Sequence, residues 1–234
     1  MRRTCWLEWT TVSFGLPALT PLLAKLLSAT VPAVQHGSDP QRFLLSFAPG
    51  ILAEWLFVLG VWVLLKRRKQ NFGYLGTWRI GNWAAWLLAL SLASLSTASN
   101  LRFLPRMHIP ISAALLPHGF HLVASLALGI TAGFCEEVLF RGFLMTEFAD
   151  AGYRKFAQVF FPGLGFAMAH LGYARYGLLA AIGIIVPTAL LGMMWGIGYL
   201  LGRRSLVPCM VAHFINDSTA GPWIAWFMFT GKLG

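Results

Sequence analysis

Long apolar stretches with few charges dominate the sequence, and their lengths predict helices that cross a membrane. A helix needs about 20 apolar residues to cross the hydrocarbon core of a bilayer. The clearest stretch covers residues 43–65 and ends abruptly at the basic run KRRK at 66–69. Further membrane segments are predicted at 83–104, 120–148, 155–173 and 177–201, with shorter ones at 206–220 and 223–229.

The N-terminal stretch 14–29, preceded by Arg2 and Arg3, fits either a first span or a signal-like segment. Lys25 and two prolines weaken both interpretations, and we favour a retained span. The total is then about seven or eight membrane segments. Since internal repeats and low-complexity linkers are absent from the sequence, we predict one integral membrane domain over residues 1–234. The predicted fold class is all-α, a polytopic transmembrane helix bundle with its active site in the membrane interior.

Composition supports a membrane protein and excludes two other classes. Hydrophobic residues make up 57% of the chain and charged residues only 11%, against about 25% charged residues in soluble domains. So few charges cannot cover a water-soluble globule, and disordered chains are poor in apolar residues. The net charge of +10 does not indicate nucleic-acid binding, because the basic residues lie between apolar stretches and do not form one polar face. The three cysteines form no CxxC pair, so their spacing predicts neither a disulfide framework nor a zinc site.

The basic residues also predict an orientation. Cytoplasmic loops of membrane proteins carry an excess of Lys and Arg. If the N-terminus is cytoplasmic and the segments alternate, twelve of the 18 basic residues fall on or near the cytoplasmic side: Arg2, Arg3, Lys66, Arg67, Arg68, Lys69, Arg79, Arg141, Arg154, Lys155, Arg203 and Arg204. We therefore predict a multi-pass cell-membrane protein whose catalytic residues lie toward the cytoplasmic half.

Two adjacent acids, Glu136 and Glu137, interrupt the apolar segment 120–148. Ionisable side chains inside a membrane segment are energetically expensive and usually functional. Neighbouring residues of an α-helix point about 100° apart, so the two carboxylates are not expected to serve the same purpose. Glu137 precedes Arg141 by four residues, the favourable order for an intrahelical ion pair. We predict that Glu137 pairs with Arg141, and that Glu136 is the freer carboxylate, suited to general acid or base chemistry.

Two histidine motifs follow in later segments. In FAMAH (166–170), Phe166 lies one turn before His170 on the same face and is interpreted as packing or as the wall of a cavity. In HFIND (213–217), His213 and Asp217 share a face, and a carboxylate can orient an imidazole and fix its tautomer. Asn216 is near enough along the helix to join the same site. Taken singly, each motif also fits a hydrogen-bonded core histidine or a polar helix end.

The combination favours chemistry, because ionisable groups on three separate membrane segments must face inward and find partners. Two histidines, a free Glu and an Asp or Asn can activate a water and stabilise an oxyanion. Glu136, His170 and His213 suit a divalent metal such as zinc with an open water position equally well. The residues fit a metal-free site and a metal site equally well, and we favour a site without a cofactor.

The remaining polar residues have plainer interpretations. Four acids lie in loops or at the ends of segments: Glu8, Asp39, Glu147 and Asp150. The four other histidines are expected at the surface: His36, His108, His118 and His121. Glu54 lies inside the segment 43–65 without a partner visible in the sequence. Facing the bundle interior would keep its charge away from lipid.

Together the motifs resemble those of the CPBP intramembrane proteases, the CAAX-protease and bacteriocin-processing group also called the Abi family. EEVLFR (136–141) resembles the family's EExxxR motif, and FAMAH resembles its FxxxH motif. HFIND resembles the last motif, HxxxN or HxxxD, and the approach to it at 198–208 is also similar. We therefore divide the chain into N-terminal spans of unrecognised type at 1–117 and a CPBP-like catalytic core at 118–220.

The resemblance implies endoproteolysis inside or at the edge of the membrane. In the family's type II CAAX prenyl endopeptidases, the first Glu and the second motif's His activate the water, roles that would fall to Glu136 and His170. The last His and the residue four positions later hold the oxyanion, which points to His213 and Asp217. An ionised Asp217 would repel an oxyanion, so we expect it to be protonated, to orient His213 or to bind metal, with Asn216 as a neutral donor. The family has been described both as metalloproteases and as glutamic proteases, and we favour the glutamic mechanism.

The resulting hypothesis is an intramembrane endopeptidase acting on a membrane-anchored or lipidated protein, with the lipid bilayer as its surroundings and no nucleic-acid partner. Prenylated C-termini, bacteriocin leaders and the C-terminal anchors of exported proteins all stay open as substrates. Two other function classes stay open. A proton-coupled transporter would use buried Glu, His and Asp as a relay, although transporters usually repeat their broken helices. A non-catalytic immunity or scaffold protein would retain the fold alone.

Overall fold

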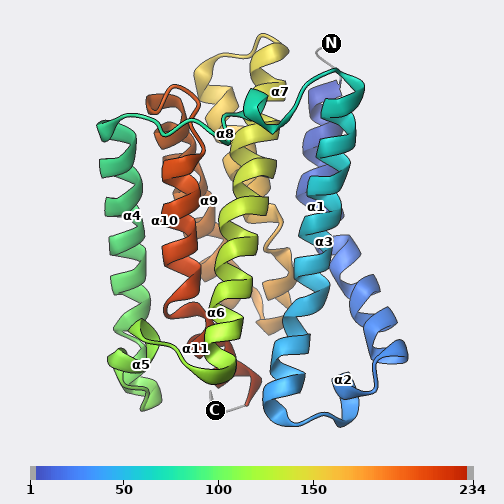
Figure 1. Ribbon diagram of the computed structural model, residues 1–234, viewed down its shortest axis with the longest axis vertical. Coiled ribbons are helices and arrows are strands. Elements are labelled where there is room, and N and C mark those ends of the chain that lie inside the picture. Colours follow the sequence, from blue (N-terminus) through green and yellow to red (C-terminus); the bar gives the residue numbers. More distant parts are fainter. Residues whose placement is uncertain (1–3, 231–234) are drawn as a thin grey trace.

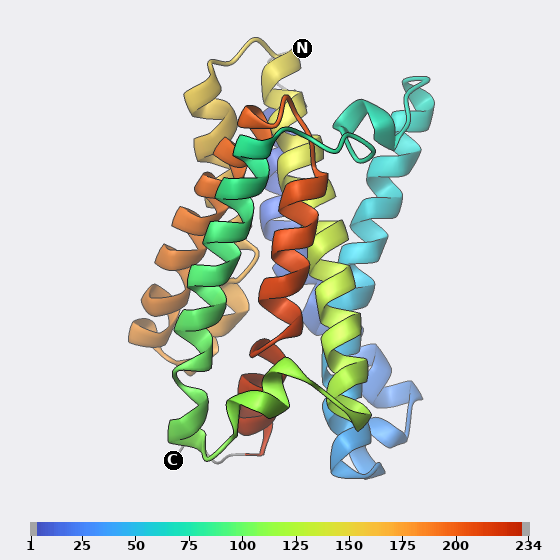
Figure 2. The ribbon, with the colours of Figure 1, turned by 60° about the vertical axis from the view of Figure 1, so that its left-hand side comes forward.

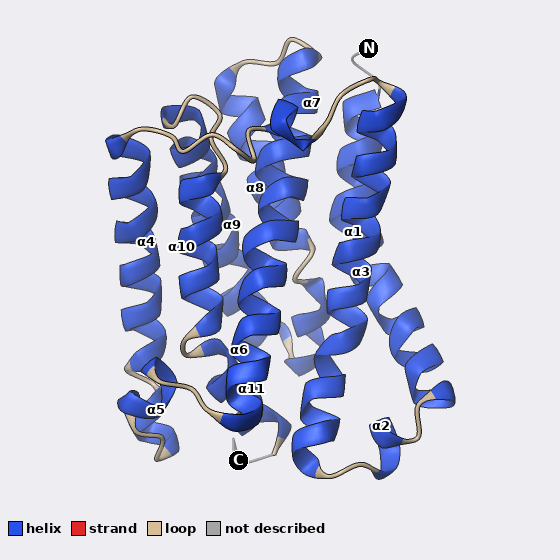
Figure 3. Ribbon diagram, viewed as in Figure 1, coloured by secondary structure: helices blue, strands red, loops and turns tan. Residues whose placement is uncertain are grey.

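The computed structural model describes residues 4–230, and every regular element within them is a helix (Figures 1 and 3). The longer elements are α1 (Thr4–Thr30), α3 (Asp39–Arg67), α4 (Trp83–Leu101), α6 (Gly119–Thr131), η3 (Ala132–Leu144), α8 (Lys155–Met168), α9 (Leu178–Leu201) and α10 (Val207–Ser218). The shorter elements are α2 (Ala33–His36), η1 (Phe72–Leu75), η2 (Leu104–Met107), α5 (Ile111–Leu115), α7 (Met145–Asp150), η4 (Leu171–Tyr176) and α11 (Gly221–Phe229). The predicted all-α membrane bundle is confirmed.

Among the described residues, five helical segments are long and apolar enough to cross a membrane: Cys5–Thr30, Asp39–Arg67, Trp83–Met107, Gly119–Asp150 and Ala181–Leu201. The predicted segments 155–173 and 206–220 correspond to the shorter helices α8 and α10, of 14 and 12 residues. The number of spans, about seven or eight from the sequence, therefore stays a prediction. Large apolar side chains such as Leu22, Leu59 and Ile130 point out of the bundle. Such a surface suits lipid and would be a liability in water.

The segment Gly119–Asp150, made of α6, η3 and α7, lies in the middle of the bundle and is the most buried of the five (Figure 1). On one side α3 packs against α6 and η3, and α1 packs against α3. On the other side α10 packs against η3, α6 and α4, as the second view also shows (Figure 2). Helices α8 and α9 pack against each other and both contact η3. Side chains on η3 are therefore surrounded by α3, α8, α9 and α10.

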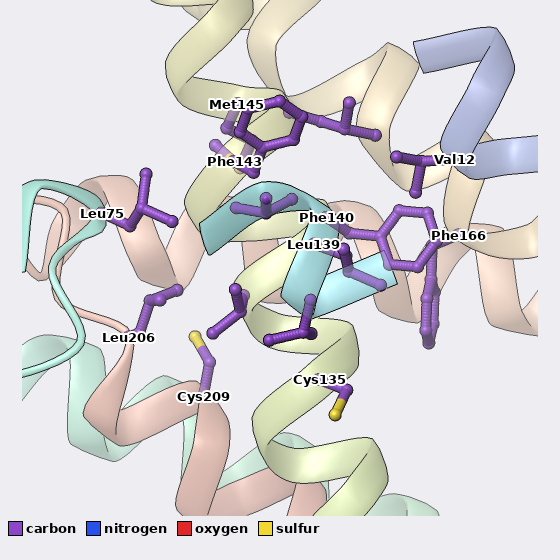
Figure 4. Close-up of a cluster of buried hydrophobic side chains, with 14 of the residues drawn as sticks. Val12, Leu75, Cys135, Leu139, Phe140, Phe143, Met145, Phe166, Leu206 and Cys209 are labelled. Atoms are coloured by element: carbon purple, nitrogen blue, oxygen red, sulfur yellow. The ribbon is translucent and has the colours of Figure 1, made fainter. Parts of the chain in front are cut away.

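The main hydrophobic core gathers around η3 (Figure 4). Leu139 and Phe140 of η3 are fully buried, and the same cluster includes Val12 of α1, Phe166 of α8 and Cys209 of α10. Inside a bilayer the surrounding lipid is as apolar as these side chains, so close van der Waals packing, not escape from water, holds such helices together. The cluster therefore joins the N-terminal helices to the segment that carries the motifs.

A glycine sets the distance between η3 and α10. A methyl group at Gly133 would lie 2.8 Å from the carbonyl oxygen of Met210 and 3.2 Å from the backbone nitrogen of Phe214. Small residues let membrane helices approach this closely. The close approach places α10, which carries His213, directly beside the helix that carries Glu136.

Charged residues tie several loops together at one end of the bundle. Arg68, just after α3, bridges Glu8 of α1 at 2.9 Å and also pairs with Glu147 of α7. The hydrogen bond to Glu147 raises the pKa of the Arg68 guanidinium. Arg79 donates a hydrogen bond to the carbonyl of Arg203 at 3.2 Å. The basic loops thus lie at the same end of the bundle, as alternating spans require. That this end faces the cytoplasm stays a prediction.

One histidine was placed wrongly from the sequence. His121, expected at the surface, is buried, and its ring stacks on Trp223 with centroids 3.5 Å apart and an angle of 10°. Helix α11 folds back against α6 and covers it. The error arises because nothing in the local sequence shows that a segment 100 residues later covers this position.

Gly133→Ala is expected to lower the free energy of unfolding by about 1–3 kcal/mol, because the added methyl must push two backbones apart. Thermal unfolding in detergent micelles measures the change. Gly60→Ala in α3 is the matched control, since nothing lies within 4 Å of its added methyl. That substitution should be neutral or stabilise the helix by up to about 1 kcal/mol. Equal stability of the two variants would contradict the close approach of η3 and α10.

Candidate active site

The EEVLFR motif lies on a π-helix, since η3 (Ala132–Leu144) has this wider form. Such helices are rare and occur frequently at functional sites. The sequence predicted an ordinary α-helix here, with Glu136 and Glu137 turned to different partners. In the structure both carboxylates contact the same imidazole, that of His213, one at each ring nitrogen. The wider turn changes the angular spacing on which that expectation depended.

Glu137 is the most enclosed carboxylate of the group. Its side chain is 0% exposed, and its Oε1 accepts hydrogen bonds from Arg141 Nη1 at 3.0 Å and from His213 Nδ1 at 2.8 Å. The ion pair with Arg141 that the spacing predicted is present. Arg141 is itself 1% exposed; its Nη2 donates to the Gly192 carbonyl at 3.3 Å and its guanidinium lies 4.3 Å from the Phe166 ring centroid. Hydrogen bonds and cation–π contact thus compensate this buried charge on several sides.

The contact with Glu137 determines the tautomer of His213. A carboxylate only accepts hydrogen bonds, so Nδ1 of His213 carries a hydrogen. The other nitrogen, Nε2, faces Glu136 Oε2 at 3.4 Å and Asp217 Oδ2 at 3.6 Å. The ring also packs against Trp195 of α9, with centroids 4.3 Å apart. Sequence reasoning missed Trp195, because a tryptophan within a long apolar stretch carries no local signal.

His170 lies just after the end of α8, where the sequence predicted a helix continuing to 173. The last carbonyls of a helix lack partners within it, and His170 Nδ1 lies 2.9 Å from the Phe166 carbonyl oxygen. Because a carbonyl can only accept, Nδ1 donates and the imidazole caps the helix. The ring meets Phe166 edge-on at 5.1 Å, and it interacts electrostatically with Glu136 and Asp217. His170 therefore joins the same group, from a helix end.

Asp217 and Asn216 bind each other. Asn216 Nδ2 donates to Asp217 Oδ1 at 2.6 Å, while the other carboxylate oxygen faces His213. The Asp217 side chain is 34% exposed, against 3% for His213. The group is thus most exposed at Asp217 and most enclosed at Glu137.

One further acid reaches this group from outside the motifs. Glu54 of α3 interacts electrostatically with Glu136, His213 and Asp217. The sequence marked Glu54 only as an acid without a partner. The sequence shows only that Glu54 is an acid inside an apolar span. Which helix its side chain faces depends on how α3 packs against η3.

Metal ligation has no ready arrangement in this conformation. Within residues 4–230, no three His, Cys, Asp or Glu side chains are grouped so as to hold a metal ion. Glu136, His170 and His213, the ligands suggested for zinc, are neighbours without forming such a group. The imidazole of His213 lies 2.8–3.6 Å from carboxylate oxygens of Glu136, Glu137 and Asp217.

Arg141→Ala should lower the free energy of unfolding by about 3–5 kcal/mol, because it leaves Glu137 buried without its cation. Thermal unfolding and the yield of folded protein in detergent measure this. The matched control is Arg42→Ala, since Arg42 pairs with Asp39 at 3.6 Å in an exposed position; it should cost under about 1 kcal/mol. Stable but inactive Arg141→Ala would instead place Arg141 in the chemistry.

Comparison with known proteins supports this grouping of motifs. A model of the family described as type II CAAX prenyl endopeptidase Rce1-like matches residues 118–219. The match includes all of η3, α8, α9 and α10, and leaves α1, α3 and α4 outside. No curated protein and no solved structure matches the chain. The resemblance to CPBP proteases drawn from the three motifs is thus confirmed over residues 118–219, which match the model of the Rce1-like type II CAAX prenyl endopeptidases.

Proposed function

We propose that this chain is an intramembrane endopeptidase that hydrolyses a peptide bond of a membrane-associated or lipidated protein. The observation that carries the proposal is the placement of Glu136. Its Oε2 is buried near the middle of a membrane segment, 3.4 Å from His213 Nε2, and accepts no hydrogen bond from the described residues. A carboxylate beside imidazoles, with an acceptor position left unused by the protein, is what a general base requires.

The proposed mechanism uses an activated water. Glu136, with His170 orienting the water, takes one proton as the oxygen attacks the scissile carbonyl carbon. Protonated His213 donates from Nε2 to the oxyanion that forms, while Glu137 holds Nδ1 and stabilises the imidazolium. The tetrahedral intermediate then collapses, the C–N bond breaks, and Glu136 returns its proton to the leaving amine. Proton transfer of this kind contributes about 10²–10⁴-fold to a rate.

In this proposal Asp217 does not donate a hydrogen bond to the oxyanion. Its carboxylate faces His213 at 3.6 Å and accepts a hydrogen bond from Asn216. An ionised carboxylate repels an oxyanion, but it stabilises a neighbouring imidazolium. We therefore assign Asp217 to keeping His213 protonated, with Asn216 holding Asp217 in place.

We favour the glutamic mechanism and route no step through a metal. The substrate would enter between the helices with its membrane anchor in lipid. Following the positive-inside rule, we place the cleaved bond toward the cytoplasmic half of a cell-membrane protein. Prenylated, leader and C-terminally anchored proteins are the classes to test.

Glu136→Gln is expected to reduce cleavage by at least about 10²-fold without changing the unfolding temperature, since glutamine keeps the shape and loses the base. The assay uses purified protein in liposomes with membrane-anchored candidate peptides and follows the cleaved product by mass spectrometry. Asp39→Asn, at an exposed position with 68% of its side chain accessible, is the control and should cleave normally. Full activity of Glu136→Gln would refute the mechanism. Proton flux without cleavage by the wild type would favour a transporter.

Chelator should leave cleavage unchanged if the mechanism is glutamic. The measurement is the initial rate in the same liposomes before and after dialysis against a strong chelator. Loss of activity that Zn²⁺ restores, together with bound zinc found by elemental analysis of the active protein, would contradict the glutamic assignment.

A further inference from the structure

The loops and adjoining helix ends at one end of the bundle carry a large excess of positive charge (Figure 1). Nine basic residues and no acid lie in three stretches there, at 66–82, 151–155 and 202–206. The acids at this end already have partners: Glu8 and Glu147 both pair with Arg68, and Asp150 accepts a hydrogen bond from the hydroxyl of Tyr74 at 2.7 Å. The remaining basic residues are therefore available to an anion from outside the chain.

A pocket of about 250 Å³ lies within this basic end, between the loop before α4 and the loop that joins α9 to α10 (Figure 2). It is lined by Arg79, Gly81, Asn82, Gly202 and Arg203. Neither arginine forms an ion pair with a carboxylate of the described residues. Two cations that line one cavity repel each other unless an anion lies between them. Guanidinium groups match the geometry of phosphate oxygens especially well.

Hydrogen bonds between the two loops fix the shape of this pocket. Arg79 Nη1 donates to the carbonyl of Arg203 at 3.2 Å, and Asn82 Nδ2 donates to the carbonyl of Leu201 at 2.9 Å. The hydroxyl of Ser205 donates to the carbonyl of Arg79. A guanidinium has five N–H donors, so Arg79 keeps donors for a ligand beyond the one that joins the loops. A pocket that is already formed loses little freedom when a ligand binds.

The pocket also lies at the surface of the membrane. Its residues stand directly before the span Trp83–Met107 and directly after the span Ala181–Leu201. Three large apolar side chains beside it point outward: Trp78 is 75% exposed, Ile80 72% and Trp83 77%. Tryptophan is enriched where a membrane meets water. The two guanidiniums are therefore placed at the depth of lipid phosphates, with apolar side chains on either side of Arg79.

We propose that this pocket binds the headgroup of an anionic phospholipid, with Arg79 and Arg203 holding its phosphate and with Trp78 and Ile80 beside its acyl chains. Basic pockets between membrane helices suit acidic lipid headgroups. A zwitterionic headgroup would bring its own cation to a region without a free carboxylate. A free phosphate would leave the exposed apolar side chains without a partner. The bound lipid would connect the start of α4 to the loop before α10, and the site is independent of the proposed proteolysis.

Lipid binding can be measured directly by native mass spectrometry of the protein in a nonionic detergent. The probes are phosphatidylglycerol, phosphatidylcholine with the same acyl chains, and glycerol 3-phosphate. Phosphatidylglycerol should bind at least about tenfold more tightly than the other two. It should also raise the unfolding temperature, because a ligand that binds only the folded protein stabilises it. Equal binding of phosphatidylcholine would overturn the proposal, as would equally tight binding of glycerol 3-phosphate.

Arg203→Gln and Arg79→Gln should each weaken the binding of phosphatidylglycerol about tenfold or more, because each removes charge-assisted hydrogen bonds. The matched control is Arg67→Gln, which removes the same charge from an exposed arginine at the same end but outside the pocket. It should weaken binding by under about fivefold. The Arg203 side chain has no hydrogen bond within the described chain, so Arg203→Gln should keep the unfolding temperature of the lipid-free wild type. An equal loss in Arg67→Gln would assign binding to the overall positive charge and overturn the proposal.

Discussion

The site depends on one buried carboxylate, that of Glu137, which holds Arg141 on the same helix and His213 on another. In a medium of low dielectric constant, a charge that loses its partner is very costly, and a fully enclosed pair therefore has little freedom to rearrange. Arg141 in turn donates to the backbone of α9 at Gly192 and lies over Phe166 of α8. Four helices thus meet at a single ion pair, and the tautomer of the imidazole follows from it.

These ion pairs and hydrogen bonds form only because the backbones of η3 and α10 lie close together. Gly133 lets α10 approach η3 within the reach of short side-chain contacts, and the π-helical turn brings both motif glutamates to the same ring. The two nitrogens of His213 then have distinct functions. Nδ1 is held by an enclosed carboxylate, while Nε2 faces the more accessible pair Glu136 and Asp217. Rigid support on one side and access on the other are what a hydrolytic site needs.

The N-terminal helices pack directly against the helix that carries the first motif. The family match begins at residue 118 and omits α3, yet α3 packs along η3 and contributes Glu54 to the electrostatics of the motif residues. Val12 and Leu16 of α1 belong to the same hydrophobic cluster as the motif helix.

Local properties of the sequence were enough to predict the membrane class, the helical fold and the Glu137–Arg141 pair. Span length, apolar composition and four-residue spacing each depend on neighbouring residues alone. The motif residues came from the same kind of local pattern. Their catalytic roles stay predictions.

Only the tertiary structure decided which groups meet. His213 contacts Glu137 across 76 positions of the chain, and α3 packs against η3. The burial of His121 under α11, the contact of Trp195 with His213 and the helix end at His170 have the same origin. Each depends on how separate helices pack. That packing is determined by small residues and side-chain shapes over the whole bundle, a property that no local pattern contains.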